Sequence, residues 1–363
     1  MTYLSGFDCT TSLARAVAVE LGGYSSAFVI VDHHARRHAA EFAAAFDGVP
    51  GLTVAEVTPG EQRKRLTLVE DLLEQAVSNG VGRGSVVIAM GGGLVGNIGG
   101  MVASLLYRGL PLVHLPTTPV AAFDSVLSAK QAVNLRQGKN LCGTFRTPTL
   151  IACDLAWLTT VPEAQLAVGL AEMAKNVLAV SPSYTDRFVD ALASRRSAPE
   201  RTLRTLLDIG IGAKASYLAI DPHERNEALV FEYGHTVGHA VEFASAGTIP
   251  HGEAVAWGML VAAELATDRY GLPEADRQTH HRLVAALGID GSKLAEVDTG
   301  LVKRLLRTDN KRGYLGTDDD ALAMVLLKAL GTPARRGARP LVPVPLRAVE
   351  EKIDAVFPRR GRQ

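Results

Sequence analysis

The chain has 363 residues, 47% of them apolar and 21% charged, so it is neither disordered nor a coiled coil and is long enough for about two domains. Its 38 basic residues balance 38 acidic ones, and a chain of zero net charge has no long-range field to collect nucleic acid or anionic lipid. We therefore expect no nucleic acid partner and no membrane association, and instead a small ligand held in a local pocket.

The cysteines and the first residues bear on the cellular compartment. Cys9, Cys142 and Cys153 are an odd number without C-x-x-C spacing, which favours reduced thiols over a disulfide framework. The N-terminus has no basic segment followed by an apolar one, as a signal peptide would. The uncharged run 85–107 is interrupted by Gly91, Gly92 and Gly93, and neither part reaches the roughly 20 residues that a bilayer requires. A cytoplasmic location is expected.

Strands and helices alternate over the first 150 residues. Apolar runs of four to six residues predict strands, and apolar residues at the 3.6-residue period predict the helices between them. This alternation predicts a mostly parallel sheet covered by helices, a Rossmann-like α/β domain over residues 1–150. The strands are expected at 28–31, 52–57, 86–90 and 112–115. The helices are expected at 35–46, from the residue after Glu61 to about Asn79, and at 94–107.

Beyond Pro148 strand signals become rare and helical periods follow one another. Residues 151–363 are therefore predicted to form a second, mainly α-helical domain. Its helices are expected at 163–180, 182–194, 199–220, 235–244, 253–270, 274–287 and 298–308.

Gly91, Gly93 and Gly96 satisfy G-x-G-x-x-G between a predicted strand and a predicted helix. Missing side chains let phosphate oxygens approach the backbone N–H groups at the positive end of a helix. A plain tight turn also explains the match, since the usual acidic residue about 20 positions later is absent. Asp32, at the end of an earlier strand, could instead accept a hydrogen bond from a ribose hydroxyl.

Two polar segments allow either a structural or a functional interpretation. Glu61 and Lys64 lie about one turn apart at a helix start, as in a capped surface helix or a ligand site. The segment 123–144 contains Asp124, Lys130, Lys139 and Asn140, which fits an exposed loop or an oxyanion pocket.

A metal site is indicated in the second domain. His235 and His239 are four residues apart, on one helical face, and His251 precedes another helix. With Glu172 they offer the carboxylate and imidazoles that bind zinc while leaving a position open. His-x-x-x-His pairs also occur by chance. A serine triad is not supported, because Gly-x-Ser-x-Gly does not occur.

Together these motifs resemble the dehydroquinate synthase superfamily of sugar phosphate cyclases, in order from Asp32 to about Lys311. The resemblance implies an N-terminal NAD-binding domain, a C-terminal metal- and substrate-binding domain, an active site in the cleft between them, and a homodimer. The matching segments are GGGLVGN at 91–97, Arg108-Gly109, PTT at 116–118, 124–130, GKN at 138–140, AEMAK at 171–175, GHTVGH at 234–239 and HGEAV at 251–255.

Residue roles follow from the same resemblance. It makes Glu172, His235 and His251 ligands of a divalent zinc or cobalt ion and leaves His239 for proton transfer or phosphate contact. Catalytic roles fall to Lys130, Glu232, His239, Lys175 and Asp124, and substrate contacts to Lys139, Asn140, Arg108, Lys214 and Lys311. The cofactor contacts are Asp32, Glu61, Lys64, Gly92, Gly93, Asn97, Thr117, Thr118, Asp124 and Thr160.

Departures from dehydroquinate synthase select a branch. Ala228 and Glu232 stand where that enzyme has an arginine and an asparagine, and a glutamate repels a substrate carboxylate but accepts bonds from sugar hydroxyls. Asn97 replaces an aspartate, and the segments 125–132, 231–235 and 309–314 also differ. These variants are similar to 2-deoxy-scyllo-inosose synthases, which make the carbocycle of 2-deoxystreptamine aminoglycoside antibiotics.

That branch implies a lyase that turns glucose 6-phosphate into 2-deoxy-scyllo-inosose and phosphate. Transient oxidation at C4 by NAD⁺ would allow phosphate elimination, and reduction and aldol cyclisation would follow without net use of cofactor. The alternatives are a 3-dehydroquinate or 2-epi-5-epi-valiolone synthase, or a metal-dependent NAD alcohol dehydrogenase. A non-catalytic subunit is disfavoured by the full set of ionisable groups.

Overall fold

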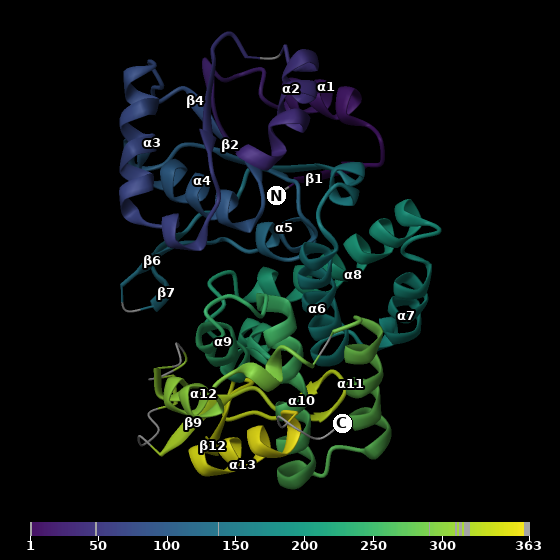
Figure 1. The fold of residues 1–363 in the computed structure, drawn as a ribbon. Helices are drawn as coiled ribbons and strands as arrows, with labels where there is room; N and C mark the ends of the chain where they lie inside the picture. Colours follow the sequence, from purple (N-terminus) through teal and green to yellow (C-terminus); the bar gives the residue numbers. More distant parts are fainter. Residues whose placement is uncertain are drawn as a thin grey trace. The chain divides into compact units, whose positions relative to one another are not determined.

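A computed structural model describes residues 2–47, 49–136, 138–289, 291–308, 311, 314–315 and 320–358. The chain divides after Pro162 into two compact units, each built from its own elements (Figure 1). Most of the segment 309–314 lies outside the described residues. Lys311 and Tyr314 are the two residues of this segment that are described.

The first unit is built on a six-stranded parallel sheet with strand order β1-β8-β5-β4-β2-β3. Strands β4, β5 and β8 are buried along their whole length, as expected of a parallel sheet covered on both faces. The four predicted strands are confirmed as β2 to β5, and β1 and β8 are additional. Their bounds are β1 Thr2–Gly6, β2 Ser26–Asp32, β3 Leu52–Val57, β4 Ser85–Gly91, β5 Leu112–Pro116 and β8 Leu150–Asp154.

Helices cover both faces of this sheet (Figure 1). One apolar core lies between the sheet and α3 and α4, and a second lies between the sheet and α1 and α2. Helix α1 was not predicted from the sequence. The bounds are α1 Thr10–Glu20, α2 Arg36–Ala45, α3 Leu66–Ser78, α4 Gly93–Leu105 and α5 Pro119–Phe123, with 3-10 turns η1 His33–Ala35, η2 Glu61–Arg63, η3 Leu106–Arg108, η4 Ser125–Leu127 and η5 Leu155–Thr159.

The segment 123–144 is largely not a loop. It contains an antiparallel hairpin of β6, Lys130–Leu135, and β7, Gly138–Phe145. The side chain of Asn97 on α4 accepts a hydrogen bond from the backbone N–H of Ala132 at 2.9 Å, which ties the hairpin to the helix. A Cβ at Gly100 would stand 2.2 Å from Gln131, so glycine permits this close packing.

The division between the units lies later than the expected boundary after residue 150. Strand β8 pairs with β1 along its whole length and with β5 at Leu150 and Ile151. The strand therefore completes the first unit's sheet, and the turn η5 that follows it belongs to the same unit.

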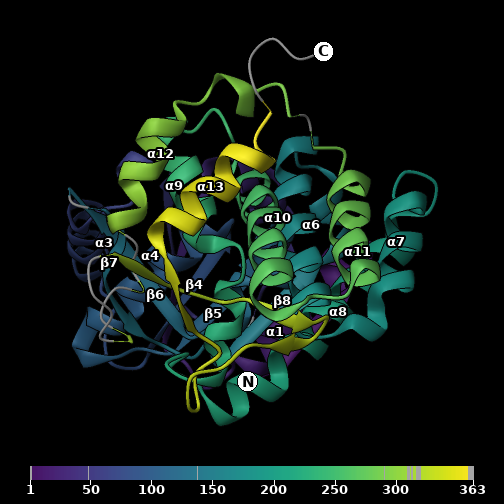
Figure 2. The ribbon, with the colours of Figure 1, turned by 90° about the horizontal axis from the view of Figure 1, so that it is seen from below.

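Helices form most of the second unit. Helix α10 packs against α9, α6, α11 and α13 and is central among them (Figure 2). All seven predicted helices are present, most of them with slightly different ends. The bounds are α6 Glu163–Ala179, α7 Thr185–Ser194, α8 Pro199–Ile220, α9 His235–Ala244, α10 His251–Tyr270, α11 Glu274–Ala286, α12 Thr299–Leu305 and α13 Leu346–Val356, with 3-10 turns η6 Pro182–Tyr184, η7 Glu227–Glu232, η8 Leu294–Glu296 and η9 Leu306–Thr308.

Glycines allow α9 and α10 to approach closely. A Cβ at Gly258 would stand 2.0 Å from the carbonyl oxygen of Gly234, and one at Gly238 would stand 2.9 Å from the Cα of Val255. Gly234 also adopts a left-handed φ of 77°, which favours glycine. These contacts set the spacing between the helices that carry His235 and His251.

The C-terminal part of the second unit contains elements that the sequence did not predict. Two antiparallel pairs, β9 with β12 and β10 with β11, precede helix α13 in the chain. The strands span two to four residues each, too few to leave a period in the sequence. Their bounds are β9 Ala321–Met324, β10 Leu327–Ala329, β11 Thr332–Pro333 and β12 Val342–Pro345.

A buried histidine on β5, whose ring lies beside Gly96 of α4, predicts that acid destabilises the first unit. His114 on β5 is 2% exposed, and burial lowers its pKa to about 4. The unfolded chain takes up this proton near pH 6.5, whereas the folded chain resists protonation until about pH 4. The free energy of unfolding therefore falls by about 3 kcal/mol as the pH drops from 7 to 4. His114→Leu should remove this loss in urea unfolding measured across that range. His281→Leu, at a partly exposed site, is the matched control, and an unchanged pH slope in His114→Leu would contradict the assignment.

Candidate metal and nucleotide sites

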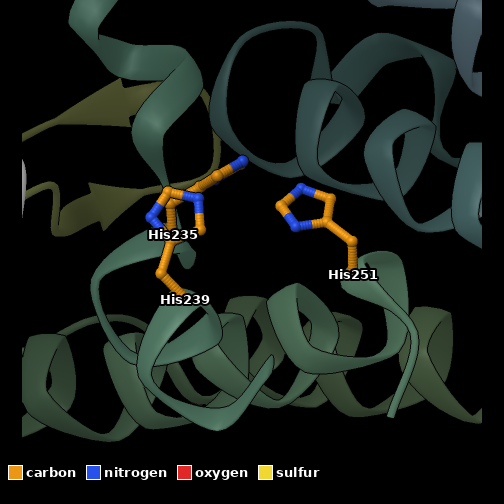
Figure 3. A group of neighbouring side chains, drawn as sticks. All are labelled: His235, His239 and His251. Carbon is orange, nitrogen blue, oxygen red and sulfur yellow. The ribbon is translucent and has the colours of Figure 1, made fainter. Parts of the chain in front are cut away.

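Three helices bring the predicted metal ligands together. The ligand nitrogens of His235, His239 and His251 lie within 4.8 Å of one another (Figure 3). Glu172 on α6 places its Oε1 3.3 Å from the Nε2 of His251 and 3.8 Å from the Nε2 of His235. This carboxylate is buried, and Oε1 makes no hydrogen bond of good geometry within the described part of the chain.

The far nitrogens of two histidines are held in place. The Nδ1 of His251 lies 3.0 Å from the Oε2 of Glu242, and the Nδ1 of His235 lies 3.1 Å from the backbone carbonyl of Tyr233. Both acceptors favour a proton on Nδ1, which leaves Nε2 of each ring as a lone-pair donor toward Glu172.

Tyr233 is itself anchored. Its hydroxyl lies 2.8 Å from the Nε2 of His280 on α11, and the Nδ1 of His280 lies 2.8 Å from the carbonyl of Asp276. Burial lowers the pKa of His280 to about 4, so the ring is neutral, with its proton on Nδ1 and Nε2 accepting from tyrosine. This chain fixes the carbonyl that orients His235.

The electrostatics of the cluster fit a divalent cation. Burial lowers the pKa of His235 to about 4, so this ring is neutral and able to coordinate. Burial opposes protonation of His251, but Glu172 and Glu242 outweigh it and raise its pKa to about 10. Burial also raises the pKa of Glu172, but Lys175 and His235 together bring it below its usual range. Zinc and cobalt prefer neutral imidazoles and an ionised carboxylate, so the ion would take the place of the proton that Glu172 and Glu242 favour on His251.

Basic groups line the same region of the second unit. Lys175, Lys214 and Lys311 are all at least 96% buried. The Nζ of Lys175 bonds Glu172 Oε2, and the Nζ of Lys311 lies 3.8 Å from Glu232 Oε2. Burial, with the neighbouring His235 and His251, lowers the pKa of His239. The second unit thus gathers the predicted metal ligands and a set of cations suited to an anionic substrate.

Glu242 was not predicted, although its place three residues after His239 could have suggested it. Replacing it by alanine is expected to weaken metal binding about 10- to 100-fold, because the Nδ1 of His251 loses its acceptor. Glu242→Gln, which keeps an acceptor but not the charge, should lose less. Chelator competition measures the affinity, with Glu274→Gln on the exposed face of α11 as control. Equal affinity in wild type and Glu242→Ala would refute this role.

In the first unit the glycine turn faces the other predicted nucleotide residues. A Cβ at Gly91 would stand 2.8 Å from the Cβ of Asp32, and one at Gly92 would stand 3.2 Å from Thr118. The absence of side chains thus leaves the N-terminus of α4 open between these residues. A pyrophosphate with a ribose beside Asp32 fits such a cradle.

The polar residues at and just after η2 and those of the hairpin are joined by hydrogen bonds and an ion pair. Lys64 donates to Asn140 Oδ1 at 2.6 Å, and Lys139 lies 3.8 Å from Glu61. Asn134 joins them, donating to Glu61 Oε1 at 2.7 Å and accepting from the backbone N–H of Asn140 at 2.9 Å. Asn134 was missed because a lone amide in a strand has no sequence signal.

The remaining predicted residues of the first unit have varied surroundings. Thr117 donates its backbone N–H to Gly91, and Thr160 Oγ1 lies 3.1 Å from the Nε2 of His38. Asn97 donates to the Gly93 carbonyl as well as holding the hairpin, which leaves only one N–H for a cofactor. Arg108 is exposed, with a φ of 70°. Asp124 follows α5, and Lys130 begins β6.

Comparison with known proteins identifies the class. The family models for the 3-dehydroquinate synthase N-terminal and C-terminal domains match residues 54–168 and 169–312. The chain belongs to the dehydroquinate synthase superfamily.

Curated relatives narrow the class. The 2-deoxy-scyllo-inosose synthase of Streptomyces ribosidificus is 46% identical over 99% of this chain and 92% of its own length. The enzyme of the same name from Streptomyces fradiae is 45% identical over 99% of this chain and 84% of its own length.

Solved structures of similar synthases support the same class of protein. A 2-deoxy-scyllo-inosose synthase complexed with carbaglucose-6-phosphate, NAD⁺ and Co²⁺ is 35% identical with a TM-score of 0.90, covering 98% of this chain and 96% of that one. A 2-epi-5-epi-valiolone synthase from Streptomyces hygroscopicus with NAD⁺ and Zn²⁺ is 25% identical with a TM-score of 0.82 over the same shares. Among the described helices, none has the length and apolarity to cross a bilayer.

Proposed function

We propose that this protein is a 2-deoxy-scyllo-inosose synthase, a lyase that converts glucose 6-phosphate to the carbocyclic ketone and phosphate. The observation that carries the choice of substrate is Glu232, half-buried beside Lys311 where dehydroquinate synthase has an asparagine. A carboxylate there accepts hydrogen bonds from sugar hydroxyls and repels an acidic substrate. The similarity to synthases of that name supports the same choice.

The cofactors follow from the donor sets. Glu172, His235 and His251 would hold a divalent zinc or cobalt ion, and the cradle of Gly91 to Gly93 with Asp32 would hold NAD⁺. When bound, the cofactor accepts and returns a hydride, and the ion acidifies the hydroxyl that is oxidised.

Side chains of the protein itself bind the substrate and move protons. Lys175 and Lys214 bind the phosphate and neutralise its charge as it leaves. The family resemblance assigns the same role to Lys130, Lys139 and Asn140. Arg108 adds to this set from the same chain or from the partner subunit. Glu232 binds sugar hydroxyls and moves protons, with Lys311 holding its carboxylate in place. His239, neutral by burial, is available to exchange a proton with the phosphate.

The same proposal covers assembly and location. From the similarity of this chain to 2-deoxy-scyllo-inosose synthases we infer a homodimer in the cytoplasm, acting in aminoglycoside antibiotic biosynthesis.

Incubation of the metal-loaded protein with NAD⁺ and glucose 6-phosphate tests the proposal. Phosphate and a carbocyclic ketone are expected, with no net NADH. Accumulating NADH with the phosphate retained would instead support a metal-dependent alcohol dehydrogenase. Turnover of sedoheptulose 7-phosphate in place of glucose 6-phosphate would support a cyclase of a seven-carbon sugar.

A further inference from the structure

One aromatic ring in the second unit faces two buried cations. The Nζ of Lys214 lies 5.2 Å from the centroid of the Phe231 ring, and the Nζ of Lys175 lies 5.9 Å from it. Phe231 is 5% exposed and lies on η7, next to Glu232. Tyr217 packs edge-on against the same ring at 5.4 Å between centroids.

Two ammonium groups so deeply buried need compensation. Lys175 is 2% exposed and Lys214 is 4% exposed, and a buried ammonium is unfavourable unless nearby groups favour its charge. Lys175 has Glu172 for this purpose. The negative face of an aromatic ring attracts a cation within about 6 Å, and the attraction grows when water is excluded.

We propose that Phe231 is a positioning residue whose ring holds the ammonium groups of Lys175 and Lys214 in one site for a phosphate monoester. Lys175 comes from α6 and Lys214 from α8, so the ring links two helices that carry the charges. An apolar side chain of similar size would fill the space but would not favour the charges. The proposal rests on the proposed function only in taking these lysines as phosphate ligands.

Binding of inorganic phosphate to the metal-loaded, NAD-loaded chain, measured by calorimetry, tests this. Phe231→Leu is expected to weaken phosphate binding about five- to thirtyfold, as loss of one or two desolvated cation–π contacts implies. Phe188→Leu is the matched control. This residue is fully buried on α7, a helix of the same unit that carries neither lysine. The substitution removes a buried ring of the same kind, and phosphate affinity should stay within about twofold.

A second variant separates electrostatics from packing. Trifluorophenylalanine at position 231 keeps the shape of the ring but withdraws the negative charge from its face. Phosphate affinity should be lower in this variant than in the wild type, while the metal content stays constant. Affinity within twofold of the wild type would overturn the proposal, even if Phe231→Leu fails to fold.

A double-mutant cycle with Lys214→Met shows whether Phe231 acts through that lysine. In the double variant the effect of Phe231→Leu should shrink to less than half, because part of its partner is gone. Additive losses would contradict the proposal. Because phosphate binding needs no turnover, loss of the proposed cyclase activity alone leaves this result readable, and the two failures are distinguishable.

Discussion

Replacing His251 by alanine is expected to remove the bound metal and to lower turnover by roughly 10³-fold. His251 Nε2 lies 3.3 Å from Glu172 Oε1. Loss of this imidazole removes one of the three predicted ligands and leaves the Glu172 carboxylate without its neighbour. A metal ion contributes several kcal/mol to stabilising the charge that develops on a reacting oxygen, and about 4 kcal/mol corresponds to a thousandfold in rate.

His239→Ala is the informative companion. The three histidine nitrogens lie close enough for a His₃ site, whereas the family resemblance assigns the ligands to Glu172, His235 and His251. The geometry supports the second set, because Glu172 Oε1 lies 3.3 Å from the Nε2 of His251 and 3.8 Å from the Nε2 of His235. The Nδ1 of each of these two rings is held by an acceptor. We expect His239→Ala to retain metal by elemental analysis. Loss of metal in His239→Ala with retention in His251→Ala would reverse the assignment.

The grouping of His235, His239 and His251 could be predicted from the sequence because the spacing of the histidines is local. His235 and His239 are one helical turn apart, and the motif around His251 starts the next helix. The residues that orient them could not be predicted in the same way. Glu242 reaches His251 from nine residues away, and His280 reaches Tyr233 from 47 residues away, contacts that depend on how helices pack.

The same distinction explains the fold. Strands β2 to β5 were predicted because each has its own apolar run between helices with a 3.6-residue period. Strand β8 was not predicted, and the expected boundary after residue 150 falls within it, because its partner β1 lies about 150 residues earlier in the chain. The hairpin of β6 and β7 reads as a polar loop because several of its side chains are exposed, and Asn97 holds it through a contact between distant segments.

Replacing Glu232 by glutamine is expected to lower kcat at least about 10²-fold while the metal content stays unchanged. The substitution keeps the shape of the side chain and removes its charge, and with it the ion pair to Lys311 at 3.8 Å. A residue that transfers protons in the transition state contributes typically 10²- to 10⁴-fold. Glu232 is no metal ligand in the proposed set, so metal affinity should not follow the rate.

Glu227→Gln is the matched control, because Glu227 lies on the same turn, η7, and pairs with Arg335 near the surface. It should leave kcat within about twofold of the wild type. If Glu232→Gln turned over glucose 6-phosphate at the wild-type rate, Glu232 would have no part in proton transfer. If it gained turnover of a carboxylated sugar phosphate instead, its charge would act only to exclude such substrates.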